Sequence, residues 1–93
     1  GTGRVFTAEA VTRRIERSIR RVGLEGKRDP LVVRVHPEVA LYVLENEKDL
    51  VKKLEGSEKL SLELRDDPLL RPDEFKLLVK SAGRDVTQQY AVA

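Results

Sequence analysis

Apolar residues recur with helical spacing along the first quarter of the chain. After a lead-in over residues 1–6, Thr7 is a plausible N-cap, and Glu9 would lie in the first turn, where a carboxylate favours the helix dipole. We expect this helix to run to about Val22 and to end at Gly23. At 100° per residue, one set of apolar side chains falls within an arc of roughly 80°. These residues are Ala8, Val11, Ile15, Ile19 and Val22. The pattern predicts a helix that packs through one face.

Three later segments have strand patterns. Leu31–Val35 is a short apolar, β-branched run, which is typical of an interior strand. Lys59–Arg65 alternates between apolar and polar residues, as a half-buried strand does. The segment 74–80 alternates in the same way. We expect the first two strands to be parallel with a right-handed crossover, and the third to be antiparallel.

The sequence predicts two short helices in the connection between the first two strands. Pro37 suits the first turn of a helix because its missing N–H would have no partner there. We expect a break near Asn46, a second helical stretch over Asp49–Glu55 and an end at Gly56. The expected inward side chains are Val39, Ala40, Val43, Leu44, Leu50, Val51 and Leu54.

These elements define one small α/β domain over residues 7–80, of order α-β-α-α-β-β. Its helices would pack on one face, or on both faces, of a small mixed sheet. Residues 81–93 are weakly patterned. Two alternatives stay open for them: anchoring through Val86 and Tyr90, or a frayed tail.

Composition narrows the class of protein. The chain has 93 residues, a net charge of +2 and no cysteine, so disulfides and zinc–thiolate sites within it are excluded. No apolar run approaches the ~20 residues that a membrane span needs. A chain without disulfides suits a reducing compartment, and we expect a cytoplasmic protein.

The first helix carries a stripe of arginines opposite its apolar face. The stripe consists of Arg13, Arg14, Arg17, Arg20 and Arg21. Guanidinium groups bind phosphates bidentately, so the stripe is a candidate site for RNA or another polyanion. The alternative is a face that meets water or protein, with Glu9–Arg13 and Glu16–Arg20 as pairs four residues apart. No aromatic residue interleaves with the arginines, so a stacking platform for single strands is not visible.

No catalytic constellation is recognisable. His36 stands at a strand end just before a helix, where an imidazole can cap the helix. Asp66, Asp67, Asp73 and Glu74 surround prolines in a loop, a composition typical of turns rather than of a Mg²⁺ site. We therefore expect no catalytic residue and no metal ligand in this chain.

Several motifs, in order, resemble a known family. The matching stretches are GTGRV at 1–5, TAEAV at 7–11, VRVHPEVA at 33–40, YVL at 42–44, NEK at 46–48, DPL at 67–69 and RPDEFKL at 71–77. Together they resemble the small C-terminal domain in the catalytic half of the ribonuclease E/G family of endoribonucleases.

This resemblance implies a thioredoxin-like fold without redox chemistry, in a non-catalytic domain that takes part in oligomer assembly of the parent enzyme. Cleavage of single-stranded RNA and its Mg²⁺ would belong to a separate domain of that enzyme. The family's structural Zn²⁺ is held by cysteines that precede the glycines, and these are absent here. No cofactor is therefore expected in this chain, and residues 1–6 are interpreted as the remnant of an interdomain linker.

Overall fold

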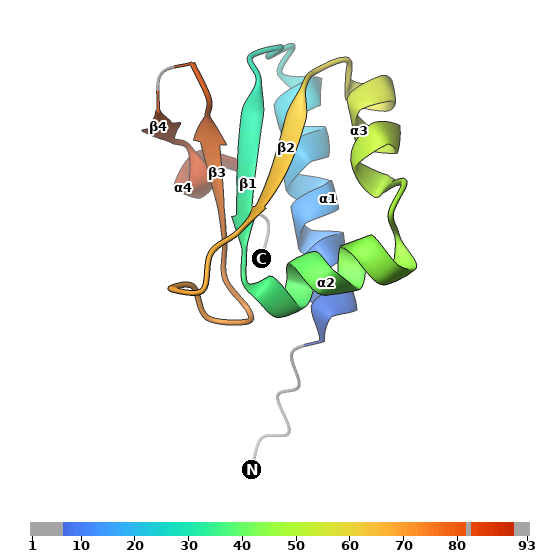
Figure 1. The fold of residues 1–93 in the computed structure, drawn as a ribbon. Coiled ribbons are helices and arrows are strands. Elements are labelled where there is room, and N and C mark those ends of the chain that lie inside the picture. Colours follow the sequence, from blue (N-terminus) through green and yellow to red (C-terminus); the bar gives the residue numbers. More distant parts are fainter. Residues whose placement is uncertain (1–6, 82, 91–93) are drawn as a thin grey trace.

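The computed structural model describes residues 7–81 and 83–90 (Figure 1). Helices and strands follow one another in the expected order up to β3, and two further elements come after it. They are α1 (Ala8–Leu24), β1 (Leu31–Val35), α2 (Pro37–Asn46), α3 (Leu50–Glu58), β2 (Leu62–Asp66), β3 (Phe75–Val79), β4 (Arg84–Asp85) and the short α4 (Thr87–Tyr90). The interpretation of residues 1–6 as a linker remnant lies outside the described residues.

The strands form one mixed sheet of order β2-β1-β3-β4. β1 pairs with β2 in parallel and with β3 antiparallel, so both predicted strand directions are confirmed. The predicted start of the second strand at Lys59 is wrong. α3 continues to Glu58, Lys59 takes the left-handed conformation, and the ladder begins where the Leu31 amide donates to the Ser61 carbonyl at 2.9 Å.

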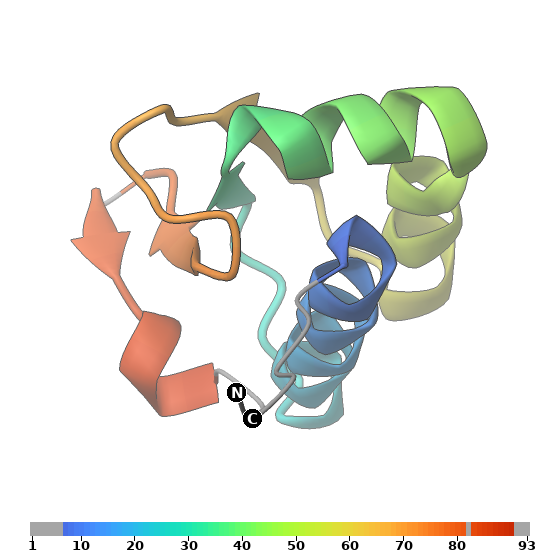
Figure 2. The same ribbon diagram turned by 90° about the horizontal axis from the view of Figure 1, so that it is seen from below.

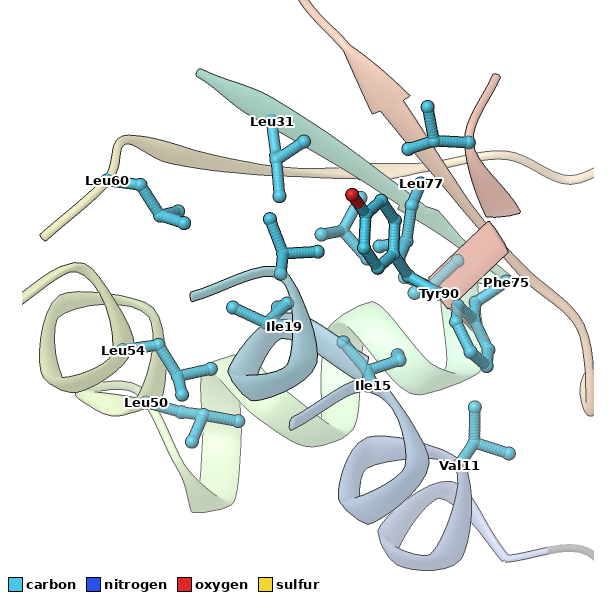
Figure 3. Packing of buried hydrophobic residues seen from close by; sticks show 14 of the residues in the cluster. Val11, Ile15, Ile19, Leu31, Leu50, Leu54, Leu60, Phe75, Leu77 and Tyr90 are labelled. Carbon is cyan, nitrogen blue, oxygen red and sulfur yellow. The ribbon is translucent and has the colours of Figure 1, made fainter. Parts of the chain in front are cut away.

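The main helices lie on one side of the sheet, and α2 crosses below its end (Figures 1 and 2). α1 is the central helix of the core, because its whole apolar face packs against other elements. Val11, Ile15, Ile19 and Val22 are all buried, as predicted, against alternate residues of β1 and β3. Those residues are Leu31, Val33, Val35, Phe75 and Leu77. Figure 3 shows part of this packing, with Ile15 and Ile19 of α1 on one side and Leu31 and Leu77 of the strands on the other.

The start of α1 agrees with the prediction, and its end does not. Thr7 caps α1 by accepting from the Ala10 amide at 3.0 Å, as predicted. Gly23, however, lies inside α1, and the left-handed residue after the helix is Gly26, with φ of 76°. A side chain at Gly23 would collide with the Glu58 carboxylate of α3, so this glycine permits close packing of two helices.

The chain beyond residue 80 takes part in the fold. β4 pairs with β3, Val86 and Tyr90 are buried, and the Tyr90 hydroxyl lies 3.1 Å from a Glu25 carboxylate oxygen. Figure 3 shows the Tyr90 ring beside Leu77. Of the two alternatives for this segment, anchoring therefore describes residues 83–90.

We predict that Tyr90→Ala lowers the free energy of unfolding by about 3–5 kcal/mol, because a large buried ring is removed. Tyr90→Phe keeps the ring and loses only the hydrogen bond to Glu25, so it should cost about 0.5–1.5 kcal/mol. Urea unfolding followed by circular dichroism measures both values. Two variants that unfold like the wild type would show that this segment does not anchor the fold.

Candidate functional site and interaction surfaces

The arginine stripe of α1 divides into residues that contact other elements and residues that point outward. Arg13 leaves the helix sideways and pairs with Glu47, the C-cap of α2, and with Glu16 at 3.0 Å. The expected partner Glu9 is not used. Arg13 therefore connects α1 to the end of α2.

Glu47 is the centre of a small polar network. Burial would raise the pKa of its carboxyl, but hydrogen bonds from Tyr42 and Arg13 outweigh that effect and leave the pKa lowered. The same carboxylate raises the pKa of Tyr42 to about 12, since it accepts the phenol proton in a hydrogen bond. Glu47 is thus held ionised between a phenol and a guanidinium.

Two further arginines contact neighbouring elements. The Arg14 guanidinium donates to the Asp73 carbonyl at 3.2 Å and lies 5.4 Å from the centroid of the Phe75 ring, a cation–π contact. Arg20 pairs with Glu16 at 3.0 Å, as predicted, and with Glu58 of α3 at 3.4 Å. Both side chains therefore hold α1 against other parts of the domain.

Arg17 and Arg21 remain. Both side chains are exposed, and neither forms an ion pair within the part of the chain that the structure describes. Of the five candidate residues, three are engaged with the domain itself, and these two are left for an external partner.

The sheet presents a second cationic surface that the sequence analysis did not find. Register places Arg34 of β1 directly between Arg65 of β2 and Lys76 of β3, on the face away from α1. All three are exposed; Arg34 pairs with Asp67 at 3.5 Å and Arg65 pairs with Glu63. Like charges directly opposite each other on neighbouring strands are unfavourable. We call this set the cation row.

An open depression of about 200 Å³ lies next to the cation row. Val32 and Leu78 form part of its wall, together with Arg34, Arg65 and Lys80. This face is left open because the main helices cover the other side of the sheet (Figure 2). A mixed sheet with one open face offers a surface for a partner.

Among the residues that the structure describes, four large apolar side chains are exposed: Leu24 (86%), Leu41 (55%), Leu44 (65%) and Leu69 (92%). The prediction that Leu44 faces inward is wrong, because its side chain is exposed. Leu41 and Leu44 lie three residues apart on α2, so they share a face of that helix. Val39 and Val43 are buried, as predicted.

The remaining candidates have structural roles. His36 caps α2, as predicted, because its Nδ1 accepts from the Glu38 amide at 3.1 Å. The Asp67 side chain accepts from the Leu69 amide at 3.0 Å, which is the turn that the Asp-Pro sequence favours. The described residues contain no cluster of three or more His, Cys, Asp or Glu side chains with the geometry of a metal site. Among the same residues, no helix has the length and apolar character to span a bilayer.

Comparison with known families identifies the domain. The family model described as "RNase E/G, Thioredoxin-like domain" matches residues 1–81. The chain therefore belongs to the RNase E/G thioredoxin-like domain family, in agreement with the mixed sheet and the helical layer described above. A comparison with curated proteins gives no match.

We predict that Glu47→Gln costs about 1 kcal/mol of stability at pH 7, since Arg13 and Tyr42 lose a charged acceptor. The folded-state pKa of Glu47 lies below its ordinary value of 4.5, so this stabilisation is present above that value and is lost as the pH falls through the folded pKa. Urea unfolding at pH 7 and pH 3 tests the sign. Glu45→Gln is the matched control, because Glu45 is exposed on the same helix. A Glu47→Gln deficit that is as large at pH 3 as at pH 7 would contradict this role.

Proposed function

We propose that this chain is the non-catalytic small domain of an RNase E/G-type endoribonuclease and that it contributes to oligomer assembly of the parent enzyme. Cleavage of single-stranded RNA would belong to a separate domain of that enzyme. Family membership supports the first statement. The absence of a metal-binding cluster among the described residues is compatible with a domain that supports catalysis elsewhere.

The exposed leucines are the observation that carries the assembly role. The interior of this small domain is closed by a continuous apolar core, yet Leu24, Leu41 and Leu44 stay more than half exposed at the ends and on the outer sides of two helices. Leu41 and Leu44 share the outer face of α2, and Leu24 lies on the last turn of α1. Exposed apolar side chains that neighbour each other on a helix face are typical of protein contacts. Their positions on helices, which are rigid, favour a defined contact over a transient one.

We predict that the 93-residue chain self-associates. Its weight-average molar mass, measured by light scattering after gel filtration, should rise above that of the monomer as concentration increases. The contact is small, so we expect the rise at tens to hundreds of micromolar rather than at nanomolar concentration. A strictly monomeric chain at all concentrations, in low and in moderate salt, would contradict the assembly role.

RNA contact is a second candidate function, and the cation row favours it. Arg65, Arg34 and Lys76 lie side by side across three strands, over about 10 Å at the usual strand spacing. An adjacent polyanion would neutralise the charge of Lys76 and would compete with Asp67 and Glu63 for Arg34 and Arg65. In this candidate function the sheet face, rather than the arginine stripe of α1, meets the phosphate backbone.

We predict that Arg34→Gln/Arg65→Gln/Lys76→Gln weakens binding of a single-stranded oligonucleotide. The slope of log affinity against log salt should fall by about 2, because three phosphate contacts are lost. Fluorescence anisotropy titrations at several salt concentrations measure this slope. Arg17→Gln/Arg21→Gln removes two charges from α1, against three in the triple variant, and is the control for loss of charge elsewhere on the domain. If the control variant loses as much affinity as the triple variant, the sheet face is not the RNA contact.

A further inference from the structure

α1 presents an outer face that is basic and apolar at once. At 100° per residue, Arg17, Arg21 and Leu24 fall within an arc of roughly 60°. The flanking arginines turn away from this arc to contact α2, α3 and the loop before β3, as described above. Leu24 is 86% exposed, at the last turn of the helix. We call these three residues the basic face.

α2 presents an outer face of the opposite charge. Glu38, Leu41, Leu44 and Glu45 fall within an arc of roughly 120° on this helix. All four are exposed, and neither glutamate forms an ion pair within the described ranges. The buried side of the same helix carries Val39 and Val43. We call these four residues the acidic face.

We propose that the basic face of one copy of this chain docks on the acidic face of a second copy. The contact would bury Leu24 against Leu41 and Leu44 and would set two guanidinium groups opposite two carboxylates at its rim. Both faces combine leucine side chains with charges that form no ion pair among the residues that the structure describes, and the charges of the two faces are of opposite sign. This complementarity selects a second copy of the chain as the occupant.

The two faces cannot meet within one chain. α1 and α2 already contact each other through other sides, where Arg13 pairs with Glu47. The contact therefore joins different patches of two copies; it is heterologous if it continues head to tail and isologous if the second copy returns it.

This inference rests on the proposed assembly role and names its surface. Two helix faces are smaller than the roughly 800 Å² per partner of a stable interface, so the contact is weak in isolation. In a parent enzyme that already holds its subunits together, the effective concentration would strengthen it. Because charges are used, association should weaken as salt increases.

Charge exchange between the faces is the decisive experiment. Variant A carries Arg17→Glu/Arg21→Glu, so both of its faces are acidic; variant B carries Glu38→Arg/Glu45→Arg, so both of its faces are basic. Sedimentation equilibrium should show that each variant alone associates at least ~10-fold more weakly than the wild type. An equimolar mixture of A and B should associate again, because every A–B contact is complementary.

Two controls accompany the exchange. Leu41→Ser should weaken association, whereas Leu69→Ser, at a residue that is more exposed but lies on neither face, should leave it unchanged. Circular dichroism establishes that A and B are folded before they are mixed. The chain that combines all four substitutions should associate like the wild type, since both its faces have exchanged sign.

The outcomes separate this inference from the proposed function. A wild-type chain that associates while A and B also associate normally would overturn the assignment of the faces and leave the assembly role intact. A mixture of A and B that stays monomeric would overturn the assignment as well. A wild-type chain that never associates would overturn both.

Discussion

The fold depends on burial of one apolar stripe of α1 against the sheet. Val11, Ile15, Ile19 and Val22 are each at most 5% exposed, and no other helix contributes as many residues to the core. A helix of 17 residues is about 25 Å long, so this contact runs along most of the sheet. Once the stripe is buried, the two flanks of α1 have fixed positions beside α2, α3 and the loop before β3.

Because the flanks of α1 are fixed beside these elements, arginines on the helix can contact them and have a structural role. Arg13, Arg14 and Arg20 each reach a different neighbouring element and join it to α1. An exposed ion pair contributes only about 0.2–1 kcal/mol, so these contacts orient the elements more than they drive folding. The Arg13 contact differs from the other two because its partner Glu47 also accepts a hydrogen bond from Tyr42, and both bonds lower the pKa of that carboxyl.

Periodicity in the sequence was sufficient for the parts of the fold that are regular over several turns or strand residues. It correctly predicted the apolar stripe of α1 and the strand Leu31–Val35, and the connections between the strands correctly predicted the directions of both pairings. It was wrong for Leu44, since a short helix at the end of the sheet has only a narrow buried side. Anchoring by Tyr90 was left open, because single apolar residues in a weakly patterned segment carry no period.

The candidate surfaces were less predictable because they depend on long-range contacts. The partners of Arg13, Arg14 and Arg20 lie 34, 59 and 38 residues away in the sequence. The arginines that remain for other contacts could therefore be identified only once the fold was known. The cation row depends on strand register, which places Arg34 beside two cations of other strands. Of the two pairs predicted from a spacing of four residues, Glu16–Arg20 forms, whereas Arg13 pairs with Glu16 and Glu47 instead of Glu9.

The packing of the core leaves the outer sides of α1 and α2 exposed. The central claim is that the outer side of α1 in one copy of the chain contacts the outer side of α2 in another copy. Backbone amide spectra recorded by NMR over a concentration series test it directly, without any substitution. We expect the resonances of Arg17, Leu24, Leu41 and Glu45 to move together as concentration rises, while Arg34 on the open sheet face stays unchanged. Shifts confined to the sheet face, or spectra that do not depend on concentration, would contradict this account.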